Sequence, residues 1–133
     1  MEYEYSRCAM QCGIIMSETR LFPSERCKGY FGTKRFDRRL DKTGCKKIHM
    51  LTAAALLELD FEQPSLDYHS LMKLMKILTR DNKNDVENMF RRMCFNVFAH
   101  NRDDHSKNFT YLYNETEDVW RLSPAYDLTY STT

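Results

Sequence analysis

Apolar side chains recur at helical spacing in the stretch just before the most polar segment of the chain. They cover more than three turns and are Val86, Met89, Phe90, Met93, Val97 and Phe98. Asn84 followed by Glu87 forms a variant of the capping box that begins many helices. The pattern predicts a helix over residues 84–99 that buries Met89, Phe90, Met93 and Val97 and holds the following loop rigidly.

The rest of the chain alternates short apolar runs with polar turns. Gly13 is a natural C-terminal stop for a predicted helix over residues 2–13. An apolar, alanine-rich run predicts a helix over 50–59, and helical spacing predicts another over 66–79. Runs rich in aromatic and β-branched residues predict strands at 19–22 and 28–37 and a hairpin over 109–122. The charged stretch 38–47 is expected to be a mobile loop. Together these elements predict a single α+β domain over 1–133, mostly helical, with a strand pair at the front and one small hairpin.

Residues 100–108 read His-Asn-Arg-Asp-Asp-His-Ser-Lys-Asn. In this loop Asp103 precedes Asn108 with four residues between them, the spacing by which a protein-kinase catalytic loop provides a base and a metal ligand. Asp127, in the segment 123–130, follows the predicted hairpin, where a kinase places its main metal-binding aspartate. Phosphoryl transfer requires a carboxylate near the attacking hydroxyl and oxygen ligands for magnesium. The order helix, loop, hairpin, aspartate therefore predicts a core like that of a kinase C-lobe.

Each of these residues also has a simpler interpretation. Asp103 and Asp104 together are typical of a solvated loop after a helix. His105 can be a metal ligand, a nucleotide contact or a structural histidine, and the chain has no C-x-x-C or H-x-x-x-H grouping typical of zinc sites. Lys107 can steady phosphate charge or remain an exposed loop lysine. Tyr126 can pack under a nucleotide or serve only the core.

Three separated motifs resemble the HipA family of serine/threonine kinases, which act as toxins of bacterial toxin–antitoxin pairs. In chain order they are Lys34-Arg35-Phe36-Asp37-Arg38, the run from Phe95 to Phe109, and the run from Trp120 to Asp127. The resemblance covers nearly the whole chain. It implies transfer of the ATP γ-phosphate to a protein hydroxyl, with Asp103 as the catalytic base and Asn108 and Asp127 as magnesium ligands.

The resemblance also implies a nucleotide site and two classes of protein partner. The residues lining the site would be His105, Ser106, Lys107, Asn108, Tyr126 and Asp127. Residues 28–37 would be the hinge strand, with Lys34, Arg35 and Phe36 against the adenine. The family usually carries an acidic residue where Lys34 stands, so the chain departs from the pattern there. The implied substrate class is an aminoacyl-tRNA synthetase, and the implied partner is a small DNA-binding antitoxin.

Composition and charge fit a cytoplasmic protein. The 133-residue chain has 20 basic and 19 acidic residues and a net charge of +1, so it carries no direct nucleic-acid signal. The basic pairs at 38–39 and 46–47 are interpreted as solvated charge or as a contact for an acidic partner. No apolar run approaches the length of a membrane span. Five cysteines, an odd number, favour a reducing compartment.

Two features expected of a kinase are missing from the sequence. Its four glycines, at positions 13, 29, 32 and 44, form no glycine-rich phosphate loop, and the sequence stops six residues after Asp127. We therefore expect the middle of a HipA-type kinase, truncated and without measurable activity alone. The alternative is a non-catalytic, kinase-like remnant that binds an antitoxin or another protein partner.

Overall fold

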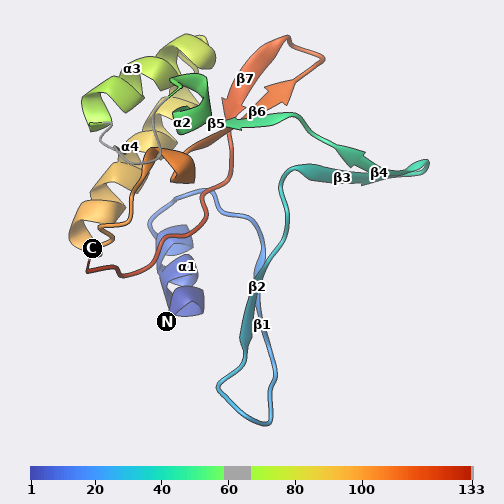
Figure 1. Ribbon diagram of the computed structural model, residues 1–133, viewed down its shortest axis with the longest axis vertical. Helices are drawn as coiled ribbons and strands as arrows, with labels where there is room; N and C mark the ends of the chain where they lie inside the picture. The colour runs from blue at the N-terminus through green and yellow to red at the C-terminus, as the bar shows by residue number, and fades with distance from the viewer. Residues whose placement is uncertain (59–66, 133) are drawn as a thin grey trace.

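The computed structural model describes residues 1–58 and 67–132 (Figure 1). In this part of the chain, four α-helices, one short 3-10 helix and seven strands form an α+β fold, as predicted. The helices are α1 (Glu2–Gln11), α2 (Ala53–Leu56), α3 (Tyr68–Leu78) and α4 (Lys83–Phe98), with the 3-10 helix at Ser106–Asn108. The strands are β1 (Thr19–Phe22), β2 (Tyr30–Thr33), β3 (Arg38–Asp41), β4 (Gly44–Lys47), β5 (Met50–Thr52), β6 (Thr110–Asn114) and β7 (Val119–Leu122).

The main core lies between helices α2, α3 and α4 and the antiparallel sheet β5-β6-β7. β6 is the central strand of that sheet. The core side chains are Ala53, Leu71, Met75, Met89, Phe109 and Tyr111. Full burial of a large apolar side chain contributes about 1.5–3 kcal/mol, so this cluster holds α3 and α4 against the sheet. Both helices begin at polar caps, because Asp67 and Asn82 accept backbone N–H bonds from the first turn.

A second, smaller core places α1 beside the end of α4. Its members are Ala9, Ile14, Phe95, Ala125 and Leu128. The backbone nitrogen of Ala125 also donates to the carbonyl oxygen of Ile15 at 2.8 Å. The segment that leads to Asp127 is therefore fixed between α1 and α4.

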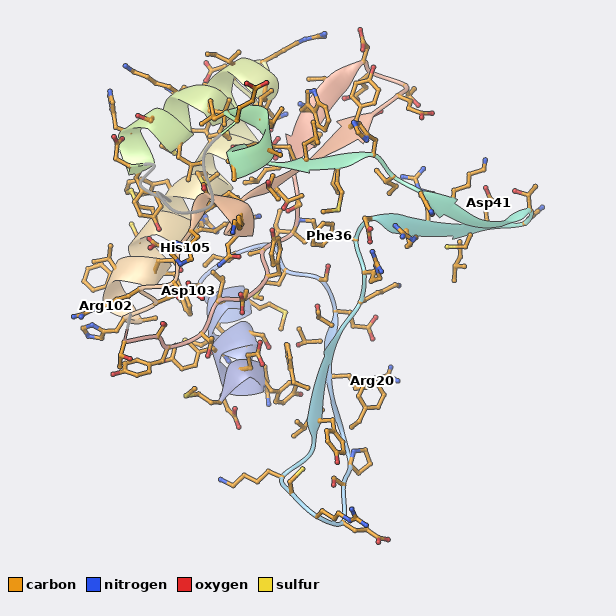
Figure 2. The ribbon with its side chains drawn as sticks, viewed as in Figure 1. Arg20, Phe36, Asp41, Arg102, Asp103 and His105 are labelled. Carbon is orange, nitrogen blue, oxygen red and sulfur yellow. The ribbon has the colours of Figure 1, made fainter. Side chains whose placement is uncertain are left out.

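Two hairpins project from this body. Strands β1 and β2 form one two-stranded sheet, and β3 and β4 form another. In Figure 1 both extend away from the helices, in different directions. Phe36 lies where the two hairpins meet (Figure 2).

The expected buried face of the helix before the polar loop is wrong in part. Met89 is fully buried and Met93 is half-buried, but Phe90 is 53% exposed and Val97 is 62% exposed. The buried face includes the polar side chains Asn88, Arg92 and Asn96, which have tertiary partners. Because these partners are distant in sequence, the spacing of apolar residues alone predicted the wrong buried face of the helix. The cap is Asn82, whose side chain accepts from Asp85 N, and not Asn84.

Two other expectations about elements are wrong. Residues 38–47 are a hairpin and not a loop, since Asp41 accepts from the backbone nitrogen of Thr43 at 2.7 Å and Gly44 takes a φ of +125°. In the stretch 50–59, Met50–Thr52 is a strand paired with β6, and only Ala53–Leu56 is helical. Residue 59 lies outside the described residues. The seven strands make the fold less helical than predicted.

Candidate functional site

The polar loop after α4 is organised by one buried side chain, that of Asn101. Its amide nitrogen donates to Asn96 Oδ1 at 2.9 Å and, in a longer hydrogen bond of 3.5 Å, to the carbonyl oxygen of Asp127. Its amide oxygen accepts from the backbone nitrogen of Asp103 at 3.2 Å. Asn101 is 4% exposed, so these bonds replace its contacts with water. One side chain thus connects α4, the loop and the segment that carries Asp127.

Asn108 closes the same loop from its other end. Its amide nitrogen donates to the carbonyl oxygen of Asp103 at 2.7 Å. The backbone nitrogen of Asn108 donates to the carbonyl oxygen of His105 at 2.8 Å, in the 3-10 turn. Because the amide nitrogen faces Asp103, the amide oxygen points away from that carbonyl. This oxygen accepts no hydrogen bond from the described residues.

The two adjacent aspartates of the loop have different environments. Asp103 Oδ1 lies 2.6 Å from His105 Nε2, and both side chains are about half exposed. Asp104 Oδ2 instead accepts from the Tyr68 hydroxyl at 2.5 Å, and that hydroxyl accepts from Asn96 at 2.9 Å. Burial, and then the bond to Asp104, raise the pKa of Tyr68. Asp104 therefore ties the loop to α3, while Asp103 faces solvent beside His105.

Tyr126 joins the loop to Phe36, between the two projecting hairpins. Its hydroxyl donates to the carbonyl oxygen of Lys107 at 2.7 Å and lies 2.5 Å from the Thr110 hydroxyl. Its ring packs against Phe36, with 5.5 Å between the ring centroids. Burial raises the pKa of Tyr126. Tyr126 therefore contacts both the backbone of Lys107 and the ring of Phe36, two residues that the family resemblance placed at the nucleotide site. Ser106, from the same prediction, is buried at the start of the 3-10 turn.

Asp127 adopts a backbone conformation that few residues other than glycine adopt. Its φ is +57°, in the left-handed region, and its side chain is exposed. Its carboxylate makes no ion pair or hydrogen bond with the residues that the structure describes. The preceding turn is anchored by buried Arg92, which donates to the carbonyl oxygen of Ser123. The fold thus holds the Asp127 backbone in an uncommon conformation beside Asn101 of the loop, and the Asp127 carboxylate has no cationic partner among the described residues.

Lys34 and Arg35 do not contact the loop through their side chains. The backbone nitrogen of Lys34 donates to the carbonyl oxygen of Glu18 at 2.9 Å. Arg35 forms a two-pronged pair with Asp37, at 2.8 and 2.7 Å. That pair lowers the pKa of Asp37. Arg35 therefore braces the junction of the two hairpins.

The sequence did not point to four residues that position the site, namely Tyr68, Arg92, Asn96 and Asn101. For Arg92, Asn96 and Asn101 the one signal is that polar side chains interrupt the apolar pattern of α4 and of the turn that follows it. This signal says that a polar residue is buried but not what it contacts. Tyr68, at the start of α3, belongs to an apolar helical pattern and gives no such signal. The partners of Arg92 and Tyr68, Ser123 and Asp104 respectively, come from distant parts of the chain.

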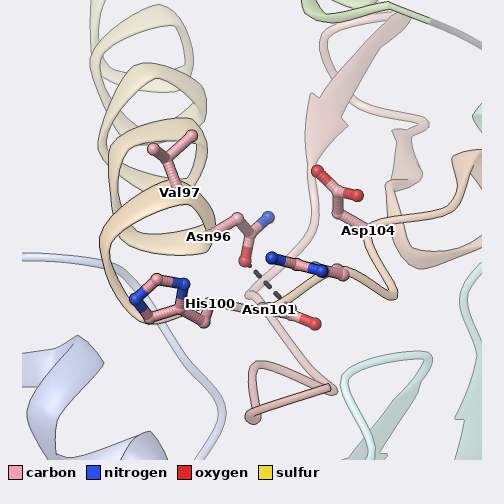
Figure 3. Close-up of a pocket in the computed structure, with 6 residues that line it drawn as sticks. Asn96, Val97, His100, Asn101 and Asp104 are labelled. Atoms are coloured by element: carbon pink, nitrogen blue, oxygen red, sulfur yellow. Dashed lines mark hydrogen bonds between the residues drawn. The ribbon is translucent and has the colours of Figure 1, made fainter. Parts of the chain in front are cut away.

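A pocket of about 350 Å³ lies between the end of α4 and the loop (Figure 3). It is lined by Asn96, Val97, His100, Asn101, Arg102 and Asp104. Figure 3 shows the Asn101–Asn96 hydrogen bond at its wall. None of the predicted nucleotide-site residues lines this pocket. In Figure 2, Arg102 and Phe36 lie on opposite sides of Asp103.

The residues present fit a magnesium ion better than a transition metal. Among residues 1–58 and 67–132, no three histidine, cysteine, aspartate or glutamate side chains are grouped to hold a metal ion. Asn108 and Asp127 offer one amide oxygen and one carboxylate, both hard oxygen donors. Magnesium is commonly held by one or two protein oxygens, with the remaining ligands from phosphates and water. This donor set is therefore compatible with magnesium bound together with a nucleotide.

Comparison with known proteins identifies the family. The model of the HipA-like C-terminal domain matches residues 1–133. The chain belongs to the HipA-like C-terminal domain family. No curated protein matches the chain. None of the helices in the described part has the length and apolar character needed to cross a membrane.

One solved structure illustrates the shared HipA fold. It is the complex of HipA and HipB with operator DNA, from the toxin–antitoxin system of Shewanella oneidensis MR-1. The match has a TM-score of 0.80 and 18% sequence identity, and it covers 97% of this chain and 34% of that chain. The HipA-like chain described here therefore spans about a third of the length of that relative.

Proposed function

We propose that the chain is the nucleotide-binding and catalytic core of a HipA-like serine/threonine kinase. The observation that carries the proposal is the role of Asn101, which bonds to both Asp103 and Asp127. A kinase requires a base and a metal ligand in fixed relative positions, because positioning supplies most of the catalysis in phosphoryl transfer. A buried amide that holds both backbones meets that requirement. In this proposal the helix, the loop and the hairpin correspond to the core of a kinase C-lobe.

In this proposal Asp103 accepts or orients the proton of the attacking serine or threonine hydroxyl. Its carboxylate is half exposed, so a protein hydroxyl can reach it, and His105 holds it at 2.6 Å. Asn108 and Asp127 would hold magnesium through their side-chain oxygens. Bound with ATP, the ion would neutralise charge on the phosphates. Asp104 takes no part in the transfer, because its carboxylate is engaged by Tyr68.

The nucleotide would lie between the loop and the hinge. Phe36 and Tyr126, whose rings are in contact, provide an aromatic surface for the adenine. His105 and Lys107 would face the phosphates and the ribose from the loop, while the buried Ser106 would support the turn between them. Lys34 and Arg35 would contribute through the backbone, since the Arg35 side chain is paired with Asp37.

The partners follow from the family and remain part of the proposal. A small DNA-binding antitoxin is proposed because the Shewanella relative is described together with HipB and its operator DNA. An aminoacyl-tRNA synthetase is proposed as the protein substrate on family resemblance alone. A toxin–antitoxin role in the cytoplasm belongs to the same proposal.

The glycines favour a second candidate for this chain alone, a kinase-like domain that binds a protein partner without turnover. Gly13 lies against Arg91, Gly29 and Gly32 pack against the side chains of β1, and Gly44 forms the tip of the β3–β4 hairpin. None of them is placed to cover a phosphate. We therefore expect weak ATP binding by the chain, and no measurable phosphorylation.

A pair of measurements tests the proposal. Calorimetry should detect weak ATP binding that requires magnesium and is reduced in Asp127→Asn. In a longer HipA-like protein that contains these residues, Asp103→Asn should reduce phosphate transfer by about 10²–10⁴-fold, the effect of a positioned general base. Asp104→Asn is the matched control and should leave transfer close to that of the parent protein. Equal losses in the two variants would contradict the assignment of the base.

A further inference from the structure

The net charge of +1 conceals a strong separation of charge along the chain. Residues 20–47, which include nearly all of the two projecting hairpins, contain ten of the 20 basic and three of the 19 acidic side chains. This segment carries a charge of +7, and the remainder of the chain carries −6. The sequence total therefore gives a misleading picture of the surface that a charged partner would meet.

In the β3–β4 hairpin, positively charged side chains lie opposite each other on the two strands. In its register Arg38 lies directly opposite Lys47, and Arg39 lies directly opposite Lys46. Like charges directly opposite each other on antiparallel strands destabilise the pairing. One cation of each pair has a carboxylate partner within the chain, and a bound polyanion would relieve the repulsion that remains.

Two acidic residues neutralise part of this charge. Asp37 pairs with Arg38 at 2.5 Å, and Asp41 pairs with Lys46 at 3.0 Å. The other three cations of the hairpin, Arg39, Lys42 and Lys47, form no ion pair with any residue that the structure describes. All three are exposed.

These unpaired cations lie on both faces of the hairpin and at its tip. Opposite residues of an antiparallel pair share a face, and successive residues alternate between faces. Lys47 is therefore on one face with Arg38, Arg39 is on the other, and Lys42 is in the turn. Every residue of β4 is exposed, and Leu40 near the tip is 82% exposed. Figure 2 shows Asp41 at the end of the hairpin that is far from the helices.

We propose that the β3–β4 hairpin binds duplex DNA by inserting into a groove between the two phosphate backbones. The major groove admits a two-stranded ribbon and presents phosphates on both of its sides. A flat acidic protein surface would meet only one face and leave a cation of the other face unpaired. Four residues of strand extend about 13 Å, enough to span several phosphates. The negative remainder of the chain is repelled by DNA, which favours approach by the hairpin tip.

Fluorescence anisotropy with a labelled 20-base-pair duplex tests this proposal on the 133-residue chain itself. Three phosphate contacts predict a slope of about −2.7 for log affinity against log salt, or about a 40-fold loss of affinity between 50 and 200 mM salt. The triple variant Arg39→Gln, Lys42→Gln, Lys47→Gln should lose most of this salt-dependent binding. The single variant Lys47→Gln should reduce the slope by about 0.9. It gives an independent result if the triple variant does not fold.

The matched control removes the same charge from the helices. Lys73 and Lys76 on α3 and Lys83 on α4 are also exposed, and the triple variant Lys73→Gln, Lys76→Gln, Lys83→Gln should bind DNA like the parent chain. An equal loss in this control would show that net charge alone governs binding, and would overturn the proposal. No binding at 50 mM salt would also overturn it. Tighter binding to polyglutamate than to the duplex would do the same, since it would indicate an acidic protein partner. The test does not depend on Asp103 or on ATP.

Discussion

The amide nitrogen of Asn108 donates to the carbonyl oxygen of Asp103 at 2.7 Å, so the proposed metal ligand and the proposed base hold each other in place. At a five-residue separation, one side chain both closes the loop through its amide nitrogen and leaves its amide oxygen directed away from the Asp103 carbonyl.

Two substitutions at Asn108 separate these roles. Asn108→Ala removes both the hydrogen-bond donor and the metal ligand. Asn108→Asp replaces the donor nitrogen by a second oxygen, adds a negative charge and retains an oxygen ligand for the metal. We expect both to reduce the free energy of unfolding by about 1 kcal/mol, the usual net value of one hydrogen bond. Only Asn108→Ala should abolish magnesium-dependent ATP binding in calorimetry. The assignment of Asn108 as a ligand fails if Asn108→Asp binds no better than Asn108→Ala.

The bond between Tyr68 and Asp104 should be visible as an energetic coupling. Tyr68→Phe and Asp104→Asn should each reduce the free energy of unfolding by about 1–2 kcal/mol. The double variant should lose clearly less than the sum, because either change alone already breaks the contact. Urea unfolding of the four proteins measures this. Asp103→Asn serves as the control and should alter stability little, since its carboxylate is half exposed. Additive losses would mean that the two side chains do not interact in solution.

Neighbouring residues of α4 offer a direct check of its orientation. Met89 is fully buried in the main core, so Met89→Ala should cost about 2–5 kcal/mol. Phe90 is 53% exposed, and Phe90→Ala should cost less than about 1 kcal/mol. Thermal melts of both variants compare the two faces. A larger loss for Phe90→Ala would support the face expected from the sequence instead.

The junction of the hairpins should contribute to stability at acid pH. The paired arginines, Arg35 first, lower the pKa of Asp37 below its usual value of 3.8. A lowered pKa means that the ionised form stabilises the fold above about pH 4, and that this contribution is lost as pH falls through the folded-state pKa. Asp37→Asn lacks this contribution. Between pH 5 and pH 3 the parent chain should therefore lose more stability than Asp37→Asn in urea unfolding. Parallel losses would show that the arginine pairs do not stabilise the carboxylate.

The sequence predicted the α+β class and the polar loop because both depend on local patterns. A run of alternating or helically spaced apolar residues and a loop rich in aspartate and asparagine are visible without tertiary information. The buried face of α4 was not predictable in this way, since Asn88, Arg92 and Asn96 are buried against partners that are distant in sequence. The strand Met50–Thr52 was missed for a similar reason, because its pairing with β6 lies about 60 residues away.

The central arrangement of the site, too, required the structure. Asn101 has the same residue type as many loop asparagines, and its sequence position does not indicate that it bonds to both Asp103 and Asp127. The sequence singled out Asp127 by its position after a hairpin. The structure adds that its backbone has a left-handed conformation, which the sequence did not indicate.

The most direct test of the proposed site is paramagnetic broadening in the NMR spectrum of the chain. Manganese accepts the same oxygen ligands as magnesium, and its effect is detected even when binding is weak. Addition of manganese with ATP should broaden the amide signals of Asn108 and Asp127 first, and Asp127→Asn should lose this effect. Broadening that spares both residues, or that is centred on another acidic surface such as 115–118, would contradict the site.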